Sequence, residues 1–73
     1  MIYRKVGDEV RLARAKRGLS QEKLAEKSGI STQHLGFIEQ GRREPQLKTL
    51  RKIADALGVR VKDLGNYPLT TGK

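Results

Sequence analysis

The sequence predicts an all-α domain of five short helices, and three observations support this fold class. Apolar residues recur at helical spacing in successive segments, with charged residues between them. Serine precedes two of these segments and glycine follows four of them, at the positions where helices begin and end. No segment of the chain has a convincing strand pattern.

The first helix is expected at about residues 3–17. Its apolar positions are Val6, Val10 and Ala13, which fall at helical spacing. Gly18 stands where a C-terminal glycine belongs. The basic residues Lys16 and Arg17 before it suit the negative end of the helix dipole.

Two short helices joined by a tight turn are expected next. Ser20 caps the second helix, and Leu24 with Ala25 forms its buried face. Gly29 ends this helix, because the sharp turn that follows needs a positive φ, which glycine adopts at little cost. Ile30 is apolar and is expected to anchor the turn to the core.

The third helix is expected at about residues 31–40. Ser31 caps it and Gly41 closes it. Leu35 and Ile38 lie three positions apart, so both face the core and the opposite face of the helix points outward.

The fourth helix is expected from about Gln46 to Leu57, after Pro45, which the first turn of a helix tolerates. Its apolar stripe consists of Leu47, Leu50, Ile53, Ala54 and Leu57. Gly58 stops this helix, and the spacing of the apolar residues beyond it suggests a short fifth helix, formed by Val59, Val61 and Leu64. We therefore expect one domain over residues 1–65 and a C-terminal tail over residues 66–73, flexible or in contact with a dimer partner.

The composition excludes several classes of protein. A chain of 73 residues holds one domain, and with no Cys it has neither a disulfide framework nor a thiolate metal site. We do not expect an enzyme, because the chain has one His and no recognisable Ser–His–Asp pattern. We also expect no metal and no cofactor. Without a long apolar run or a signal peptide, a soluble cytoplasmic protein is expected.

The charge points to a polyanionic partner. Lys and Arg number 16 against 8 Asp and Glu, which gives a formal net charge of +8 and a pI of about 10.3. DNA, RNA and an anionic membrane surface are the partners that such an excess favours. The segment from Ser20 to Gln40 is not itself basic, because Lys23 and Lys27 are outnumbered there by Glu22, Glu26 and Glu39, and basic segments flank it.

The segments RGLSQEKLAEKSGIS and IEQGRREPQLKTLRKIADALGV carry a specific resemblance. Their pattern is similar to that of the lambda-repressor/Cro-like family, also called Xre-like, from about Val6 to Leu64. The matching positions of the helix-turn-helix are Gln21, Leu24, Ala25, Gly29, Ile30, Leu35 and Ile38. The resemblance implies a five-helix lambda-repressor-like DNA-binding domain, with the helix-turn-helix at its second and third helices.

The spacing is consistent with this reading on physical grounds. Two helices that cross steeply need a small residue where they touch, which is Ala25. A third helix that is fastened on one face can present its other face to the DNA major groove, which is about 12 Å wide and accepts an α-helix.

The resemblance implies contacts to bases from the third helix. The residues implied are Thr32, Gln33, Gly36 and Phe37. An amide such as that of Gln33 can bond adenine N6 and N7 together. Phe37 and Gly36 depart from the family pattern: Phe37 either touches a thymine methyl or sugar or packs on a neighbouring side chain or dimer surface, and Gly36 either allows close backbone approach or has no role.

Other positions match contacts to the DNA backbone. The residues implied are Gln21, Ser31, His34, Arg42 and Arg43. Gln21 begins the second helix, whose positive end favours a phosphate. The resemblance also implies a structural ion pair between Arg14 and Glu39, which would orient the third helix.

We therefore expect a transcriptional regulator, more consistent with a repressor than an activator, that binds a palindromic double-stranded operator as a homodimer. The expected dimer contacts are Val61, Leu64, Tyr67 and Leu69. An antitoxin that binds both its promoter and a protein toxin is the alternative, and a further protein partner stays open. RNA binding is a weaker reading, because RNA readers usually display aromatic residues, which make up 4% of this chain.

Overall fold

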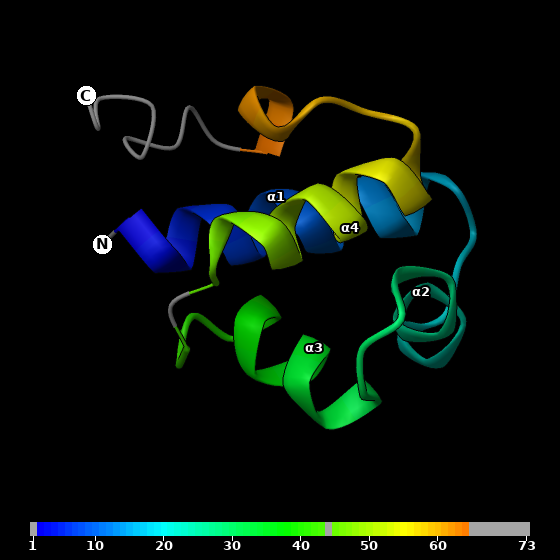
Figure 1. Cartoon of the computed structure of the whole chain (residues 1–73), viewed down its shortest axis with the longest axis horizontal. Helices are drawn as coiled ribbons and strands as arrows, with labels where there is room; N and C mark the ends of the chain where they lie inside the picture. The colour runs from blue at the N-terminus through cyan, green and yellow to red at the C-terminus, as the bar shows by residue number, and fades with distance from the viewer. Residues whose placement is uncertain (1, 44, 65–73) are drawn as a thin grey trace.

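The computed structural model describes residues 2–43 and 45–64, with side chains from Val6 onward. This part of the chain forms four α-helices and one 3-10 helix (Figure 1): α1 (Ile2–Lys16), α2 (Gln21–Ser28), α3 (Thr32–Glu39), α4 (Leu47–Leu57) and η1 (Val61–Leu64). The predicted all-α class is confirmed. The expected tail, with Tyr67 and Leu69, lies outside the described residues.

The helices pack in pairs around a single core. α3 packs mainly on α1, α2 packs mainly on α4, and α2 and α3 also contact each other. η1 contacts α1 and α4 and lies on the opposite side of them from α3 (Figure 1). Every element contributes to the core, which consists of Val6, Val10, Leu24, Ala25, Leu35, Ile38, Leu50, Ile53, Ala54, Leu57 and Leu64.

The local signals at the helix ends are confirmed. Ser20 Oγ accepts a hydrogen bond of 3.0 Å from the backbone N–H of Lys23 and so caps α2. Ser31 Oγ accepts a bond of 3.0 Å from the N–H of His34 and caps α3. Gly29 ends α2 with φ 74°, the left-handed conformation that the tight turn was expected to need.

The fifth helix differs from the expectation, because it is a four-residue 3-10 helix and excludes Val59. The backbone N–H of Val59 donates to the carbonyl of Ala54 at 3.0 Å, so Val59 belongs to the turn that closes α4. The N–H of Asp63 then donates to the carbonyl of Arg60 at 2.9 Å, a bond that defines the tighter helix.

The described residues contain no helix that is both long and apolar enough to cross a membrane.

Candidate nucleic-acid interface

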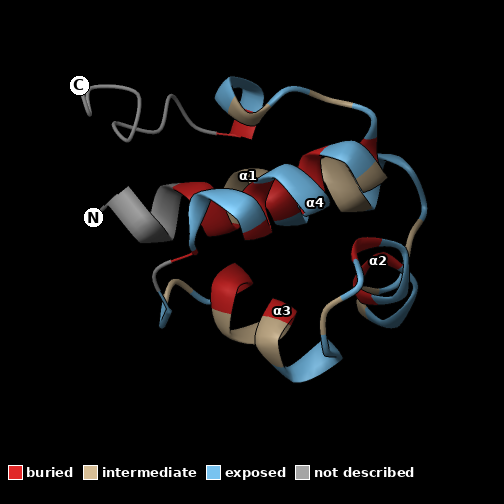
Figure 2. Cartoon of the chain, in the orientation of Figure 1, coloured by how far each residue is buried: buried red, intermediate tan, exposed pale blue. Residues whose placement is uncertain are grey.

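α3 has one face in the core and one face in solvent. Leu35 and Ile38 are completely buried. Thr32 and Gln33, in the first turn of α3, are exposed. In Figure 2 the buried positions of α3 lie on its side toward α1 and α4, and its exposed first turn points away from them. The two polar side chains at this turn are therefore free to contact a partner.

His34 and Phe37 are half-buried and lie between these two faces. Gly36, which was also expected to contact bases, is half-buried against α2. A Cβ at Gly36 would lie 3.8 Å from both amide heavy atoms of the Gln21 side chain, an ordinary van der Waals distance. A methyl group at Gly36 would therefore fit beside the Gln21 side chain.

Glu39 links three segments through its carboxylate at the end of α3. Arg14 of α1 donates to it twice, from Nε to Oε2 at 2.7 Å and from Nη2 to Oε1 at 3.0 Å. Gln21 at the start of α2 donates from Nε2 to Oε1 at 3.0 Å. Arg14 Nη1 also donates to the carbonyl of Leu19 at 3.0 Å. The side chain of Glu39 is 3% exposed and that of Arg14 is 17% exposed, so this network orients α3 from within the protein.

Gly7 brings α1 against the main chain of α3, a contact that the sequence reasoning missed. A Cβ at Gly7 would meet the carbonyl oxygens of Ile38 and Glu39, the latter at 2.8 Å, which is closer than real Cβ atoms come. A glycine inside a helix costs about 1 kcal/mol relative to alanine, so an interior glycine between Val6 and Val10 is itself a signal of close packing. The main chains of α1 and α3 therefore meet directly.

The C-terminal end of α3 presents two arginines to solvent. Gly41 has φ 74°, and the backbone N–H of Arg42 donates to the carbonyl of Phe37 at 3.0 Å. The guanidinium carbon of Arg42 lies 5.5 Å from the centre of the Phe37 ring. Arg42 and Arg43 are both exposed. Of the two readings of Phe37, packing on a neighbouring side chain is therefore present in the structure.

The expected dimer contacts within the described chain are Val61 and Leu64, and Leu64 is 2% exposed and belongs to the core of its own chain. Val61 is half-buried. Leu12 of α1, which the sequence reasoning did not single out, is 55% exposed and borders a groove between α1 and η1.

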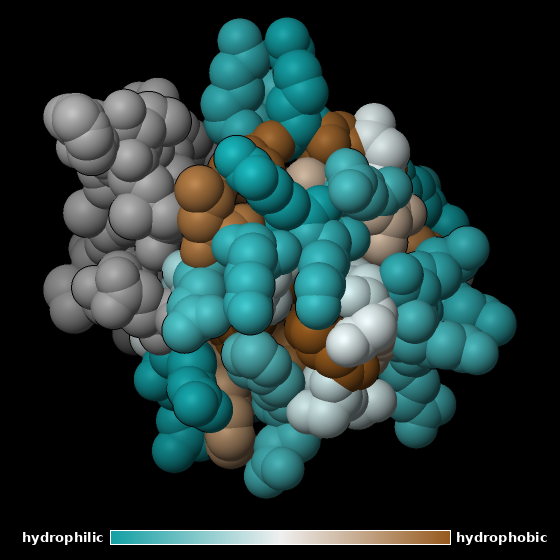
Figure 3. Space-filling view, viewed as in Figure 1, coloured by the Kyte–Doolittle hydropathy of each residue, from teal (hydrophilic) through white to brown (hydrophobic). Residues whose placement is uncertain are grey.

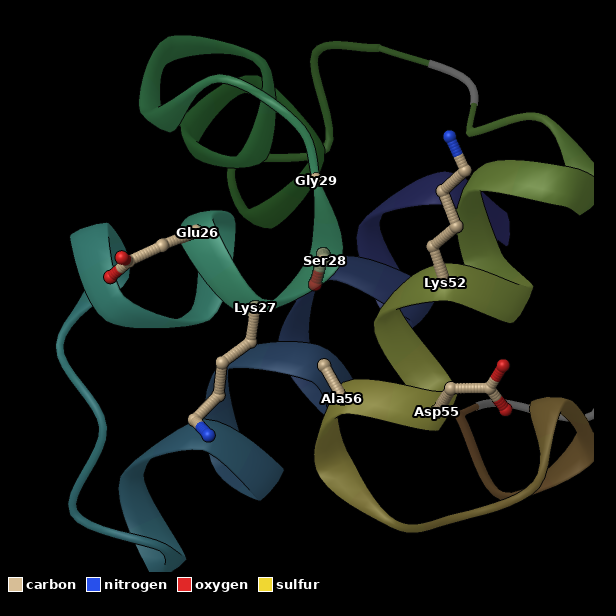
Figure 4. Close-up of a pocket in the computed structure, with 7 residues that line it drawn as sticks. All are labelled: Glu26, Lys27, Ser28, Gly29, Lys52, Asp55 and Ala56. Carbon is tan, nitrogen blue, oxygen red and sulfur yellow. The ribbon is translucent and has the colours of Figure 1, made fainter.

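A hollow between α2 and α4 does not belong to this interface. Its volume is about 440 Å³, and it is lined by Glu26, Lys27, Ser28, Gly29, Lys52, Asp55 and Ala56. The charged ends of its side chains point away from one another (Figure 4), and both signs of charge are present. Ser28 Oγ is buried there without a hydrogen-bond partner in the described chain. This hollow therefore lacks a convergent set of groups for an anion.

On the face shown in Figure 3, the surface of the described residues is largely hydrophilic, with small separate apolar areas. In the described part of the chain, no group of three His, Asp or Glu side chains is placed to bind a metal ion. The exposed polar first turn of α3, with the exposed Arg42 and Arg43 after its other end, is a surface suited to a nucleic acid.

Comparison with known proteins identifies the family. The model of the HTH_3 helix-turn-helix family matches residues 10–64. The chain therefore belongs to this Xre/Cro-like family of DNA-binding transcriptional regulators, which is not a family of enzymes.

Two relatives in sequence illustrate the match. An uncharacterized HTH-type transcriptional regulator, y4dJ of Sinorhizobium fredii, is 44% identical over 54 residues, which are 74% of this chain and 70% of the relative. The immunity repressor protein of Bacillus phage phi105 is 43% identical over 56 residues, 77% of this chain. The matched region spans 39% of that repressor, which is therefore a longer protein.

Two solved structures have the same fold. The restriction-modification controller protein C.AhdI of Aeromonas hydrophila is 37% identical with a TM-score of 0.83, over 85% of this chain and 94% of the other. SinR, described as the master regulator for biofilm formation and crystallised in complex with DNA, is 32% identical with a TM-score of 0.78, over 81% and 95%. A relative of this chain has thus been crystallised in complex with DNA.

Proposed function

We propose that this chain is a sequence-specific repressor that inserts α3 into the major groove of double-stranded DNA. The observation that carries the proposal is the exposed first turn of α3, with Thr32 and Gln33, on a helix whose other face is fastened by Leu35 and Ile38. An α-helix enters the major groove with the N-terminal part of the recognition helix at the base edges.

Gln33 and Thr32 are the residues that read bases in this proposal. The amide of Gln33 offers a donor and an acceptor, which match adenine N6 and N7. The hydroxyl and methyl of Thr32 suit either a base edge or a thymine methyl. Gly36 has no side chain with which to read a base, so its part is either a close approach of the backbone to DNA or none.

The DNA backbone is bound by groups at both ends of the helix pair. Arg42 and Arg43 supply exposed positive charge after α3. Gln21 is fixed by its bond to Glu39, at the positive end of α2. Ser31 uses its oxygen to accept the capping bond from His34, which leaves its O–H to donate to a phosphate. The half-buried ring of His34 is the last of the groups proposed to bind a phosphate.

The chain acts as a homodimer on a palindromic operator in this proposal. One helix pair contacts few bases, and a dimer doubles the site, with half-sites about 34 Å or roughly 10 base pairs apart. In the described chain, Val61 and the exposed Leu12 provide apolar area near η1. Footprinting that shows one isolated half-site protected at saturation would contradict the dimer.

A repressor role is supported by the likeness to the immunity repressor of phage phi105. The test is to select bound duplexes from a random library and then to measure transcription from a promoter that overlaps the selected site. We expect one preferred sequence with two-fold symmetry, and transcription that falls as protein is added. If the protein bound random duplex or single-stranded RNA as tightly as the selected duplex, sequence-specific binding to DNA would be contradicted.

A further inference from the structure

The α-helices of the described chain all end in the same hydrogen-bonded turn. A glycine with positive φ follows each helix, and the next residue donates its backbone N–H to a carbonyl in the last turns of that helix. The four donor and acceptor pairs are Leu19 to Arg14, Ile30 to Ala25, Arg42 to Phe37 and Val59 to Ala54. This is the Schellman motif, in which the two paired residues commonly make an apolar contact.

α3 departs from the other three helices at the residue after the glycine. After α1, α2 and α4 this residue is apolar and packs on the core, as Leu19, Ile30 and Val59. After α3 it is Arg42, which is exposed. The partner position is Phe37, the one Phe of the chain, and the 5.5 Å between guanidinium and ring centre lies within the range of a cation–π contact.

We propose that Phe37 is a positioning residue for Arg42, whose guanidinium the ring fixes beside the end of α3. This inference rests on the proposed binding of DNA. An unrestrained arginine loses rotamer freedom when it binds a phosphate, and this loss weakens binding. The turn at Gly41 and the Phe37 ring restrict Arg42 before DNA arrives, helped by its bond of 3.4 Å from Nη1 to Gln40 Oε1. Phe37 thus raises affinity through Arg42 and not by contact with a base.

The first test needs no DNA. Protons above an aromatic ring give NMR signals shifted upfield, so the side-chain signals of Arg42 should be shifted upfield in the free protein. Phe37→Leu should return them to ordinary positions, and Phe37→Tyr, which keeps a ring, should leave them shifted. Ordinary Arg42 signals in the wild-type protein would overturn the proposal.

The second test measures affinity for one selected duplex at several salt concentrations. Phe37→Leu should lower affinity about three- to ten-fold, the cost of ordering one long side chain, with the salt dependence unchanged. Phe37→Tyr should bind nearly as the wild type does. Circular dichroism of each variant should confirm that the helices are intact.

A double-mutant cycle separates positioning from direct contact. In a protein that already carries Arg42→Ala, Phe37→Leu should lower the affinity for the duplex little further. In the matched background Arg43→Ala, Phe37→Leu should lower the affinity by its full amount. An equal loss in both backgrounds, or a changed base preference, would overturn the proposal and assign Phe37 to direct contact with DNA. Failure of the proposed function looks different: the wild type would bind no duplex at all, while the Arg42 signals stayed shifted.

Discussion

The carboxylate of Glu39 at the end of α3 receives two hydrogen bonds from the guanidinium of Arg14 in α1, at 2.7 and 3.0 Å. With the side chain of Glu39 only 3% exposed, removal of Arg14 leaves a buried charge without its main partner. We expect Arg14→Met to destabilise the protein by about 3–5 kcal/mol. Urea unfolding of the variant and the wild type measures this difference.

The double variant Arg14→Met with Glu39→Met is the control for that prediction. It removes both charges together, so it should be clearly more stable than Arg14→Met alone. A double variant that is less stable by the sum of both single losses would mean that the pair does not interact.

Alanine substitutions at Gly7 and Gly36 should change the stability of the protein in opposite directions. Both glycines lie inside helices, where alanine is favoured by about 1 kcal/mol. At Gly36 the new methyl group meets Gln21 at an ordinary distance of 3.8 Å, so Gly36→Ala should stabilise the protein by up to about 1 kcal/mol. At Gly7 it meets backbone carbonyls that cannot move aside, so Gly7→Ala should destabilise by on the order of 1–3 kcal/mol.

Thermal unfolding of the two alanine variants and the wild type under identical conditions shows the direction of each change in stability. A loss of DNA affinity in the stabilised Gly36→Ala variant would show that DNA approaches the backbone closely at that point. Equal destabilisation by the two substitutions would contradict the packing described for Gly36.

Gln33→Ala should relax base preference without weakening binding to random DNA. The discrimination should fall by about 1–3 kcal/mol at one base pair of each half-site. Binding to the selected operator and to its single-base variants measures the effect, and the salt dependence should barely change. If the variant binds every duplex more weakly by the same factor, α3 does not read bases through Gln33.

Arg43→Ala should have the complementary effect. Removal of a charge that binds a phosphate weakens binding to all sequences almost equally. It also flattens the plot of log affinity against log salt concentration by about one unit for each phosphate that is no longer neutralised. Titrations with operator and random duplex over a range of salt concentrations measure this slope. A shift in base preference would instead assign Arg43 to the reading of bases.

We expect Asp63 of η1 to contribute to a pH dependence of the stability of the fold. The backbone N–H of Arg60 donates to Asp63 Oδ2 at 3.0 Å and, with the charges of Arg60 and Lys62, lowers the pKa of this carboxyl below 3.8, although desolvation opposes the shift. Because the pKa is lower in the folded state, the stabilisation is present above the unfolded-state pKa, near 3.9, and is lost as pH falls through the folded-state value.

The matched variant for this prediction is Asp63→Asn, which keeps the shape and removes the charge. It should be less stable than the wild type at neutral pH, and the difference should shrink as pH falls below about 4. Melting curves between pH 7 and pH 2 measure the difference. If the difference in stability between the wild type and the variant stayed constant over that range, the Asp63 charge would not stabilise the fold.

The sequence predicted the features that are local. Ser20, Ser31 and Gly29 act within a few residues of their own positions, so their roles followed from the sequence and are present in the structure. The replacement of the fifth α-helix by η1 was not predictable from apolar spacing, because one short stretch of Val and Leu suits either helix type. In the structure the bond from Asp63 to Arg60 makes this segment a 3-10 helix, and the bond from Val59 to Ala54 leaves Val59 in the turn after α4.

Features that depend on distant segments were harder to predict. The close contact of Gly7 with Ile38 joins two helices far apart in sequence, and apolar periodicity carries no information on how closely main chains approach. The burial of Leu64 depends on where η1 meets α1 and α4, which spacing does not give. The assignments of Thr32 and Gln33 to bases, and of Arg42 and Arg43 to phosphates, stay predictions.

The meeting of the α1 and α3 main chains at Gly7 separates two tasks that one short helix must perform. The orientation of α3 depends on backbone atoms and on the buried side chains of Leu35, Ile38 and Glu39. The exposed Thr32 and Gln33 take no part in its support. Exchanging those exposed side chains therefore costs the fold little. A duplicated copy of this chain could acquire a new operator in a few substitutions, while the scaffold beneath it stayed the same.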